Sequence, residues 1–176
     1  MILTELRIEN YKHYGGSHVI PFREQGLVAI IGANGVGKTT LFEAIEWCLY
    51  KPSKLGNDQV LTRNGTAATQ VQVVLTDPES GLQYIVERRM RRSGGIQASV
   101  YRADQPEYPI ANGTTEVTKY VARTLIGLDY PAFISTFFTR QKELAYFGSE
   151  SAATRRKAVS RLLGYDAIDT ARQSIA

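Results

Sequence analysis

Residues 32–40 read GANGVGKTT, and this stretch constrains the fold more than any other part of the chain. Its residues Gly32, Gly37, Lys38 and Thr39 fit the spacing G-x-x-x-x-G-K-[ST], in which a glycine-rich loop joins a strand to a helix. The preceding run, GLVAIIG at 26–32, is apolar throughout and predicts a strand buried on both faces. The following residues, 39–50, predict a helix with one apolar face, formed by Leu41, Ala44, Ile45, Cys48 and Leu49.

A loop of this composition is suited to binding phosphate. Its glycines let the backbone curl so that successive N–H groups point inward, and the helix that follows adds the positive end of its dipole. We expect Lys38 to reach the β- and γ-phosphates as a point charge and the Thr39 hydroxyl to bind Mg²⁺. Thr40 is predicted to be a first-turn helix residue rather than a ligand. The alternative is a glycine-rich turn with no ligand, which the flanking strand and helix disfavour.

The remaining segments divide into a β-rich part and a helical part. Residues 3–10 alternate as a half-buried strand does, and 18–24 predict a second strand after a turn at Gly15-Gly16. Residues 71–77, 83–91 and 97–104 read as further strands, and 116–127, 152–164 and 167–176 as helices. Pro52 and Gly56 are expected to end the helix that begins near Thr39, and Trp47 is expected to be partly exposed.

Composition places the chain among globular proteins. It has 176 residues, of which 43% are hydrophobic and 22% charged, and a net charge of +4. No apolar run approaches the roughly 18 residues that span a bilayer, and the N-terminus lacks the basic segment of a signal peptide. We therefore expect an intracellular, cytoplasmic protein, associated with the nucleoid in a bacterium or with the nucleus in a eukaryote. The single cysteine, Cys48, is predicted to be a buried structural thiol.

Two local patterns imitate functional motifs of nucleotide hydrolases. Asp77 follows a strand and could hold Mg²⁺, but Thr76 interrupts the apolar run and residues 78–81 favour a hairpin turn. Ser93-Gly94-Gly95 imitates a signature that must open a helix, whereas the residues after it read as a strand. Both are predicted to be turns.

The chain resembles a known family in several segments. ELRIENYKHYGG (5–16), GLVAIIGANGVGKTTLFEAIEWCLY (26–50) and LTRNGTAATQVQVVL (61–75) look like the N-terminal half of an SMC-like coiled-coil ATPase head. TFFTRQKELAYF (136–147) and ATRRKAVSRLLGYDAID (153–169) resemble the Q-loop and the helix entering the coiled coil of the same family. The likeness is greatest to SbcC-type ATPases of DNA double-strand-break repair and covers nearly the whole chain.

The resemblance implies an α/β P-loop NTPase fold. It implies an ABC-type head lobe with an antiparallel β subdomain over residues 1–150 and a helical segment at 151–176 that begins a coiled coil. In such a head the C-terminal half supplies the signature segment, the acidic strand and the catalytic glutamate. The implied partners are that half, a second identical head, a nuclease subunit and double-stranded DNA bound without sequence specificity, with no membrane role. ATP hydrolysis would belong to the full protein and be very weak in this fragment.

The resemblance also implies roles for individual residues. Catalytic roles would fall to Lys38 and Gln141, and Mg²⁺ would be held by Thr39 and Gln141, since an amide can bind the ion and orient water. Gln141 could instead be an ordinary loop glutamine, and Lys12 a solvated lysine at a strand end. Nucleotide contacts would come from Lys12, Asn34, Gly35, Gly37, Lys38, Thr39 and Thr40.

Clustered arginines are candidates for sequence-tolerant contacts with DNA phosphates. One group lies in ERRMRRSGG (87–95), where alternation sets Arg89 and Arg91 on one face and Arg88 and Arg92 on the other, with Met90. Another group contains Arg155 and Arg156, followed by Lys157 and Arg161. The alternative for both is a solvated surface.

Two other functions remain open at the level of sequence. One is a self-contained P-loop NTPase or kinase that uses Asp77 as its acid. The other is an ABC-type ATPase subunit that has no role on DNA. Turnover by this chain alone would distinguish the first, and the lack of salt-sensitive DNA binding by the complete head would distinguish the second.

Overall fold

The computed structural model describes residues 1–52 and 67–137 and divides the chain into two compact units, Met1–Gly127 and Leu128–Ala176. The predicted boundary after residue 150 lies outside the described residues. In the second unit the structure describes helix α4 (Tyr130–Phe137). Asp129 begins this helix, because its Oδ1 accepts the N–H of Ala132 at 2.9 Å.

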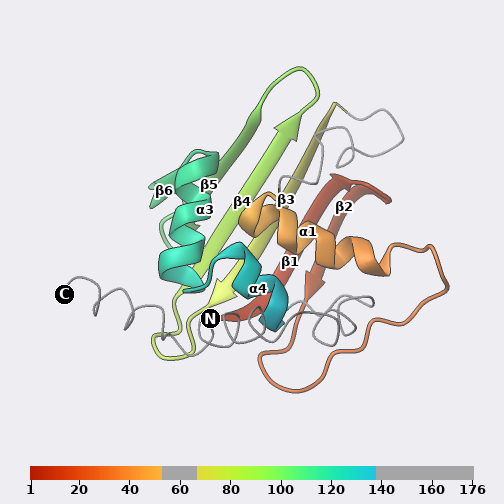
Figure 1. The fold of residues 1–176 in the computed structure, drawn as a ribbon, viewed down its shortest axis with the longest axis horizontal. Coiled ribbons are helices and arrows are strands. Elements are labelled where there is room, and N and C mark those ends of the chain that lie inside the picture. The colour runs from red at the N-terminus through yellow and green to blue at the C-terminus, as the bar shows by residue number, and fades with distance from the viewer. Residues whose placement is uncertain (53–66, 138–176) are drawn as a thin grey trace, which may run out of the picture. The chain divides into compact units, whose positions relative to one another are not determined.

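The described part of the first unit is built on a six-stranded antiparallel sheet with the order β2-β1-β3-β4-β5-β6 (Figure 1). The central strands carry the alternation seen in the sequence, with Leu6, Ile8 and Val71 completely or almost completely buried. The predicted antiparallel β subdomain is therefore confirmed. The strands are β1 (Ile2–Tyr11), β2 (Tyr14–Pro21), β3 (Ala68–Thr76), β4 (Gln83–Arg91), β5 (Ile96–Arg102) and β6 (Ala111–Asn112).

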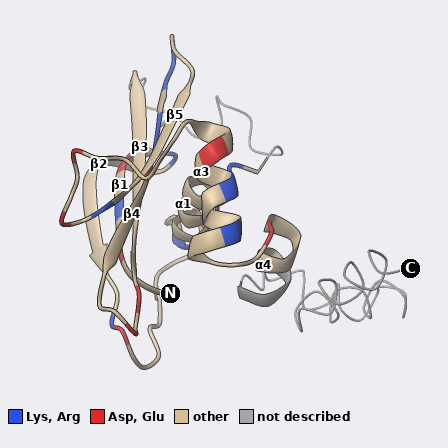
Figure 2. Cartoon of the chain, turned by 90° about the vertical axis from the view of Figure 1, so that its left-hand side faces the viewer, with Lys and Arg blue, Asp and Glu red and all other residues tan. Residues whose placement is uncertain are grey.

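Helices cover one face of this sheet, and the core lies between the two layers (Figures 1 and 2). Helix α1 (Lys38–Tyr50) packs on β3 and β4, and α3 (Thr114–Tyr120) packs on β5. A π-helical turn, η1 (Val121–Leu125), continues α3 and ends before Gly127, as predicted. None of the helices in the described ranges has the length and apolar character needed to cross a membrane.

The η1 turn explains a small error in the predicted helical face. Val117, Val121 and Leu125 are buried as expected, but Thr124 is exposed. A π-helical turn has more residues per turn than an α-helix, so positions after Val121 rotate away from the expected stripe.

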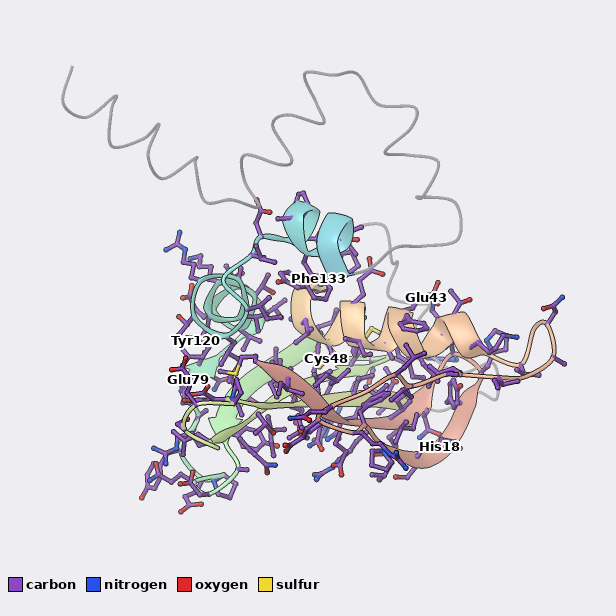
Figure 3. All side chains as sticks on the ribbon, turned by 90° about the horizontal axis from the view of Figure 1, so that it is seen from below. His18, Glu43, Cys48, Glu79, Tyr120 and Phe133 are labelled. Atoms are coloured by element: carbon purple, nitrogen blue, oxygen red, sulfur yellow. The ribbon has the colours of Figure 1, made fainter. Side chains whose placement is uncertain are left out.

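Helix α1 buries its whole predicted apolar face, including Ala44 and Cys48 (Figure 3). The expectation that Trp47 is partly exposed is wrong, because its side chain is 1% exposed and its ring lies 5.6 Å from that of Tyr11. Tyr11 belongs to β1, so the sheet covers Trp47 in addition to the predicted apolar face of α1. The helix ends at Lys51, which has φ 46°, immediately before Pro52. Gly56 lies outside the described residues.

The predicted buried strand at 26–32 is wrong for this structure, which has no strand there. Leu27 is 96% exposed and Ile31 is 91% exposed. An apolar run becomes a doubly buried strand only when other strands flank it. No strand in the described parts of the chain pairs with these residues.

The turn between β1 and β2 also differs from the prediction. It lies at Lys12-His13 rather than at Gly15-Gly16, and Tyr11 pairs with Tyr14 across it. Lys12 has φ 50°, which a two-residue hairpin loop requires. The two glycines fall inside β2, where Gly16 donates its N–H to Oδ1 of Asn10 at 2.9 Å.

The burial of Cys48 leads to a chemical prediction. Its thiol is completely buried and donates to the carbonyls of Val71 and Val86, and burial raises its pKa to about 12. Because the thiolate is the nucleophile, we expect native Cys48 to react with iodoacetamide at least about a hundred times more slowly than an exposed thiol. The measurement is mass spectrometry of labelled protein. The control is Ser93→Cys at the exposed tip of the β4–β5 hairpin, and equal rates for the two thiols would contradict the prediction.

Candidate phosphate-binding site

The glycine-rich loop adopts a backbone that favours glycine at two positions. Gly35 has φ 83° and Gly37 has φ 101°, both in the left-handed region. Gly37 is also closely packed, because a Cβ built on it would lie 3.2 Å from Cε2 of Tyr14. The Tyr14 hydroxyl donates to the Gly37 carbonyl at 3.2 Å. The first residue of β2 therefore supports the end of the loop where α1 begins.

Lys38 closes the loop from the helix side. Its Nζ donates to the carbonyl oxygens of Gly32 at 2.7 Å and Ala33 at 2.6 Å. The ammonium is thus held against the start of the loop, where its positive charge is available to an anion. Thr39 beside it is exposed, whereas Thr40 is 5% exposed. The prediction of Thr40 as a first-turn helix residue agrees with this burial, and its backbone N–H remains the group that a phosphate could use.

The N-terminus of α1 has no internal substitute for an anion. Its N-cap is Gly37, which forms no side-chain capping bond, and its first turn has no acidic residue. The first N–H groups of a helix have no intrahelical acceptors and carry the positive end of the dipole. The backbone of Gly35 and Gly37, the Lys38 amine and the exposed Thr39 hydroxyl therefore fit a nucleotide phosphate with Mg²⁺.

Lys12 lies in the β1–β2 turn and faces α1. Its Nζ is 2.7 Å from Oε2 of Glu43, and its side chain is 15% exposed. The alternative of a solvated strand-end lysine therefore does not describe this structure. The Tyr11 hydroxyl adds a bond to the Glu43 carbonyl at 3.2 Å. The two contacts attach the turn to the helix that begins at the phosphate-binding loop, and a contact of Lys12 with phosphate stays a prediction.

The two imitated motifs are turns, as predicted. Asp77 begins the β3–β4 hairpin turn: its carboxylate accepts bonds from the Ser80 hydroxyl and from the Glu79 N–H. These bonds hold the Asp77 pKa below its usual value. Glu79, in the same turn, lies at the end of the sheet away from the loop that leads into α1 (Figure 3). Residues 93–95 form the tip of the β4–β5 hairpin and open no helix.

The arginine group at 88–92 does not act as a single surface. Arg88 is 0% exposed and lies in the core, so it cannot contact DNA, because the face it shares with Met90 packs against the helices. Arg89 lies on the opposite face and donates to Oε1 of Gln70 at 3.0 and 2.6 Å. Arg91 and Arg92 are exposed at the end of β4 and in the hairpin turn that follows it. Arg89 and Arg91 remain candidates for DNA contact.

Several predicted site residues lie outside the described residues. These are Gln141, Arg155 and Arg156, together with Lys157 and Arg161, and the predictions about them stand as made. Sequence reasoning missed the contact of Tyr14 with the loop and the pairing of Glu43 with Lys12. It had a signal for Arg88, since strand alternation already set this residue on the face of Met90.

The packing at Gly37 yields a test of the loop. We expect Gly37→Ala to weaken nucleotide binding roughly tenfold or more, because a left-handed backbone strains alanine by about 1–3 kcal/mol and the Tyr14 ring adds a close contact. The measurement is the dissociation constant of a fluorescent ATP analogue. Gly95→Ala is the matched control, since a Cβ there meets nothing within 4 Å. Equal affinity of the two variants would show that the Gly37 backbone does not shape the site.

Comparison with known proteins places the chain in a family. A family model described as an AAA domain matches residues 5–174. A DNA double-strand break repair Rad50 ATPase of Methanocaldococcus jannaschii is 32% identical over 99% of this chain and 16% of its own length. A protein of the same name from Methanopyrus kandleri is 31% identical over 98% of this chain and 20% of its own. The chain spans about a fifth of the length of these relatives.

A solved structure confirms the fold independently of close sequence identity. It comes from a study of ATP-driven dimerization and DNA stimulated activation of SMC ATPases, and it is 20% identical to this chain. The likeness covers 92% of this chain and 99% of that one, with a TM-score of 0.69. The chain therefore belongs to the AAA-domain family, and its fold is that of the solved SMC ATPase structure.

Proposed function

We propose that this chain is the ATP-binding N-terminal half of an ATPase head that acts in DNA double-strand-break repair. The observation that carries the proposal is the loop at 32–40, where the Lys38 amine and an uncapped helix N-terminus adjoin left-handed glycines. The relatives are named as repair ATPases, which supports the choice of process. Bound ATP would supply the energy for a change in head association.

The proposed ligands follow from the chemistry of each residue. Backbone N–H groups of Gly35, Gly37 and Thr40 would hold phosphate oxygens, and Lys38 would neutralise the terminal phosphates. Asn34 and Lys12 would add contacts at the same end of the nucleotide. Thr39 would bind Mg²⁺ through its hydroxyl, with Gln141 as a second ligand that also orients the attacking water.

The site would be completed by other segments. The C-terminal half of the same head would supply the signature segment, the acidic strand and the catalytic glutamate. The exposed side chains of Leu27 and Ile31 support this, since contiguous exposed apolar surface usually marks an interaction site. A second head would close over the ATP, and a nuclease subunit and duplex DNA would complete the assembly. DNA contacts without sequence preference would involve Arg89, Arg91, Arg155 and Arg156.

The first test separates this proposal from a self-contained NTPase. In the complete protein we expect Lys38→Ala to abolish ATP binding, because the terminal phosphates lose their charge partner. Asp77→Ala should leave ATP hydrolysis within about twofold, because surface substitutions in a turn rarely affect more than local stability. The measurements are nucleotide titration and phosphate release. Steady phosphate release by residues 1–176 alone, abolished by Asp77→Ala, would establish the alternative function.

The second test concerns Gln141. We expect Gln141→Ala in the complete protein to leave ATP affinity nearly unchanged while ATP-dependent head dimerisation falls by about tenfold or more, since the amide would act after nucleotide and Mg²⁺ are bound. Sedimentation with a non-hydrolysable ATP analogue measures dimerisation. Gln97→Ala, at an exposed position of β5, is the control. Normal dimerisation and hydrolysis in the Gln141 variant would make this residue an ordinary loop glutamine.

A further inference from the structure

Arg88 is a buried cation in the core of the sheet-and-helix layer. It lies in β4 between Val71 of β3 and Ala98 of β5, all three completely or almost completely buried. Its Nε donates to the Cys48 carbonyl at 3.0 Å and its Nη2 to the Thr118 hydroxyl at 3.3 Å, while its Nη1 has no partner. Burial lowers its pKa to about 10, so the guanidinium stays charged at neutral pH. Burying a charge costs free energy unless the charge is paired or hydrogen-bonded, so the partners of Arg88 need an account.

The Cys48 carbonyl needs a donor from outside its own helix. In α1 the N–H of Lys51 reaches the Trp47 carbonyl at 3.0 Å, which is the last regular helical bond. The next donor in the helical pattern, four residues after Cys48, would be position 52. That residue is Pro52, which has no N–H. Within the described residues no backbone N–H donates to this buried carbonyl, and the Arg88 guanidinium supplies a donor.

The charge of Arg88 suits this end of the helix. Carbonyls at a helix C-terminus carry the negative end of the dipole, and a cation placed there is stabilising, most of all when partly buried. Helix α1 has no basic residue of its own in its last turn. No ion pair between Arg88 and a carboxylate occurs among the residues that the structure describes. The helix end is thus the electrostatic partner of the guanidinium.

The same guanidinium connects three elements. It extends from β4, binds the last turn of α1 and binds Thr118 of α3, whose hydroxyl in turn donates to the Thr114 carbonyl at 2.9 Å. The other end of α1 is attached to the β1–β2 turn through Glu43 and to Tyr14 through Gly37. The far end of the helix that carries Gly37, Lys38 and Thr39 is therefore tied to the sheet by the Arg88 guanidinium as well as by the Cys48 thiol.

We propose that Arg88 is a positioning residue for the phosphate-binding loop, acting by capping the C-terminus of α1 and holding this helix in register with the sheet. The proposal rests on the proposed function, because it assumes that nucleotide binds at residues 32–40. A helix is rigid along its axis, so a shift or rotation at Cys48 moves the N–H groups at its first turn. The predicted effect of losing Arg88 is weaker nucleotide binding beyond any loss of stability.

The test compares Arg88→Met with Val100→Ala in the complete protein. Methionine keeps an apolar stem but no donor, whereas Val100, also 0% exposed, lies on β5 in the same core, where it pairs with Val86 of β4. Both variants should lower the melting temperature. We expect the dissociation constant of a non-hydrolysable ATP analogue, measured by calorimetry well below both melting temperatures, to rise roughly tenfold for Arg88→Met and less than about twofold for Val100→Ala.

Equal affinities of Arg88→Met and Val100→Ala would overturn the proposal and leave Arg88 a residue of stability alone. If Arg88→Met does not fold, Arg88→Lys replaces it, because its ammonium keeps the charge but cannot reproduce the two-pronged geometry. The affinity of Arg88→Lys for the ATP analogue should be about threefold lower than that of the wild-type protein. An unchanged affinity would contradict the proposal. Failure of the wild-type protein itself to bind nucleotide would instead reject the proposed function, so the two failures are distinguishable.

Discussion

The bond from the Arg88 guanidinium to the Cys48 carbonyl joins the end of α1 to the sheet on which this helix packs. Helix α1 has unsatisfied polar groups at both ends, as every helix does. At its start the free N–H groups adjoin the glycine loop and remain open to an anion. At its end Pro52 removes a donor, and a buried cation replaces it. One end of the helix is thus open to a ligand, and the other end is satisfied inside the core.

The charged side chains on the two faces of the sheet differ in their burial and in their hydrogen-bond partners. On the helix side a single guanidinium is buried, with Cys48 and Thr118 as its partners. On the outer side the charged side chains form hydrogen bonds with neutral amides. Glu87 accepts from Gln70 at 2.9 Å and from Gln72 at 2.6 Å, and Arg89 donates to Gln70. Arg89 would therefore exchange an existing bond for any contact with a phosphate, which makes its contribution to DNA affinity smaller than that of a free arginine.

Much of the fold could be predicted from local patterns. Alternation located β1, β3, β4 and β5, helical periodicity located α1 and α3, and the turns at 77–81 and 93–95 were correctly assigned. These are elements whose partners are near in sequence or whose burial is one-sided. The run at 26–32 was misassigned because its state depends on strands that the described residues do not contain. Trp47 was misassigned because helical periodicity gives the direction of the apolar face and not how far around the helix a large residue of the sheet, here Tyr11, extends.

The site was predictable in type but not in its supports. The spacing of Gly32, Gly37, Lys38 and Thr39 is a motif with a mechanism, so the loop could be assigned from its sequence. The contacts of Tyr14, Glu43 and Arg88 join residues that are 23 to 40 positions apart in the chain. A local sequence pattern does not predict hydrogen bonds over such separations. Arginine is seldom buried, and Arg88 is an exception because its guanidinium donates to the Cys48 carbonyl, which Pro52 cannot do.

The exposed run from Leu27 to Ile31 has a consequence for how the protein is made. It is short, rich in β-branched and aliphatic residues and without charge, which are the properties of a segment that pairs with its own copies. Until another segment covers this run, two copies of the lobe can associate through it. A lobe produced without the segment that covers this run is therefore expected to aggregate.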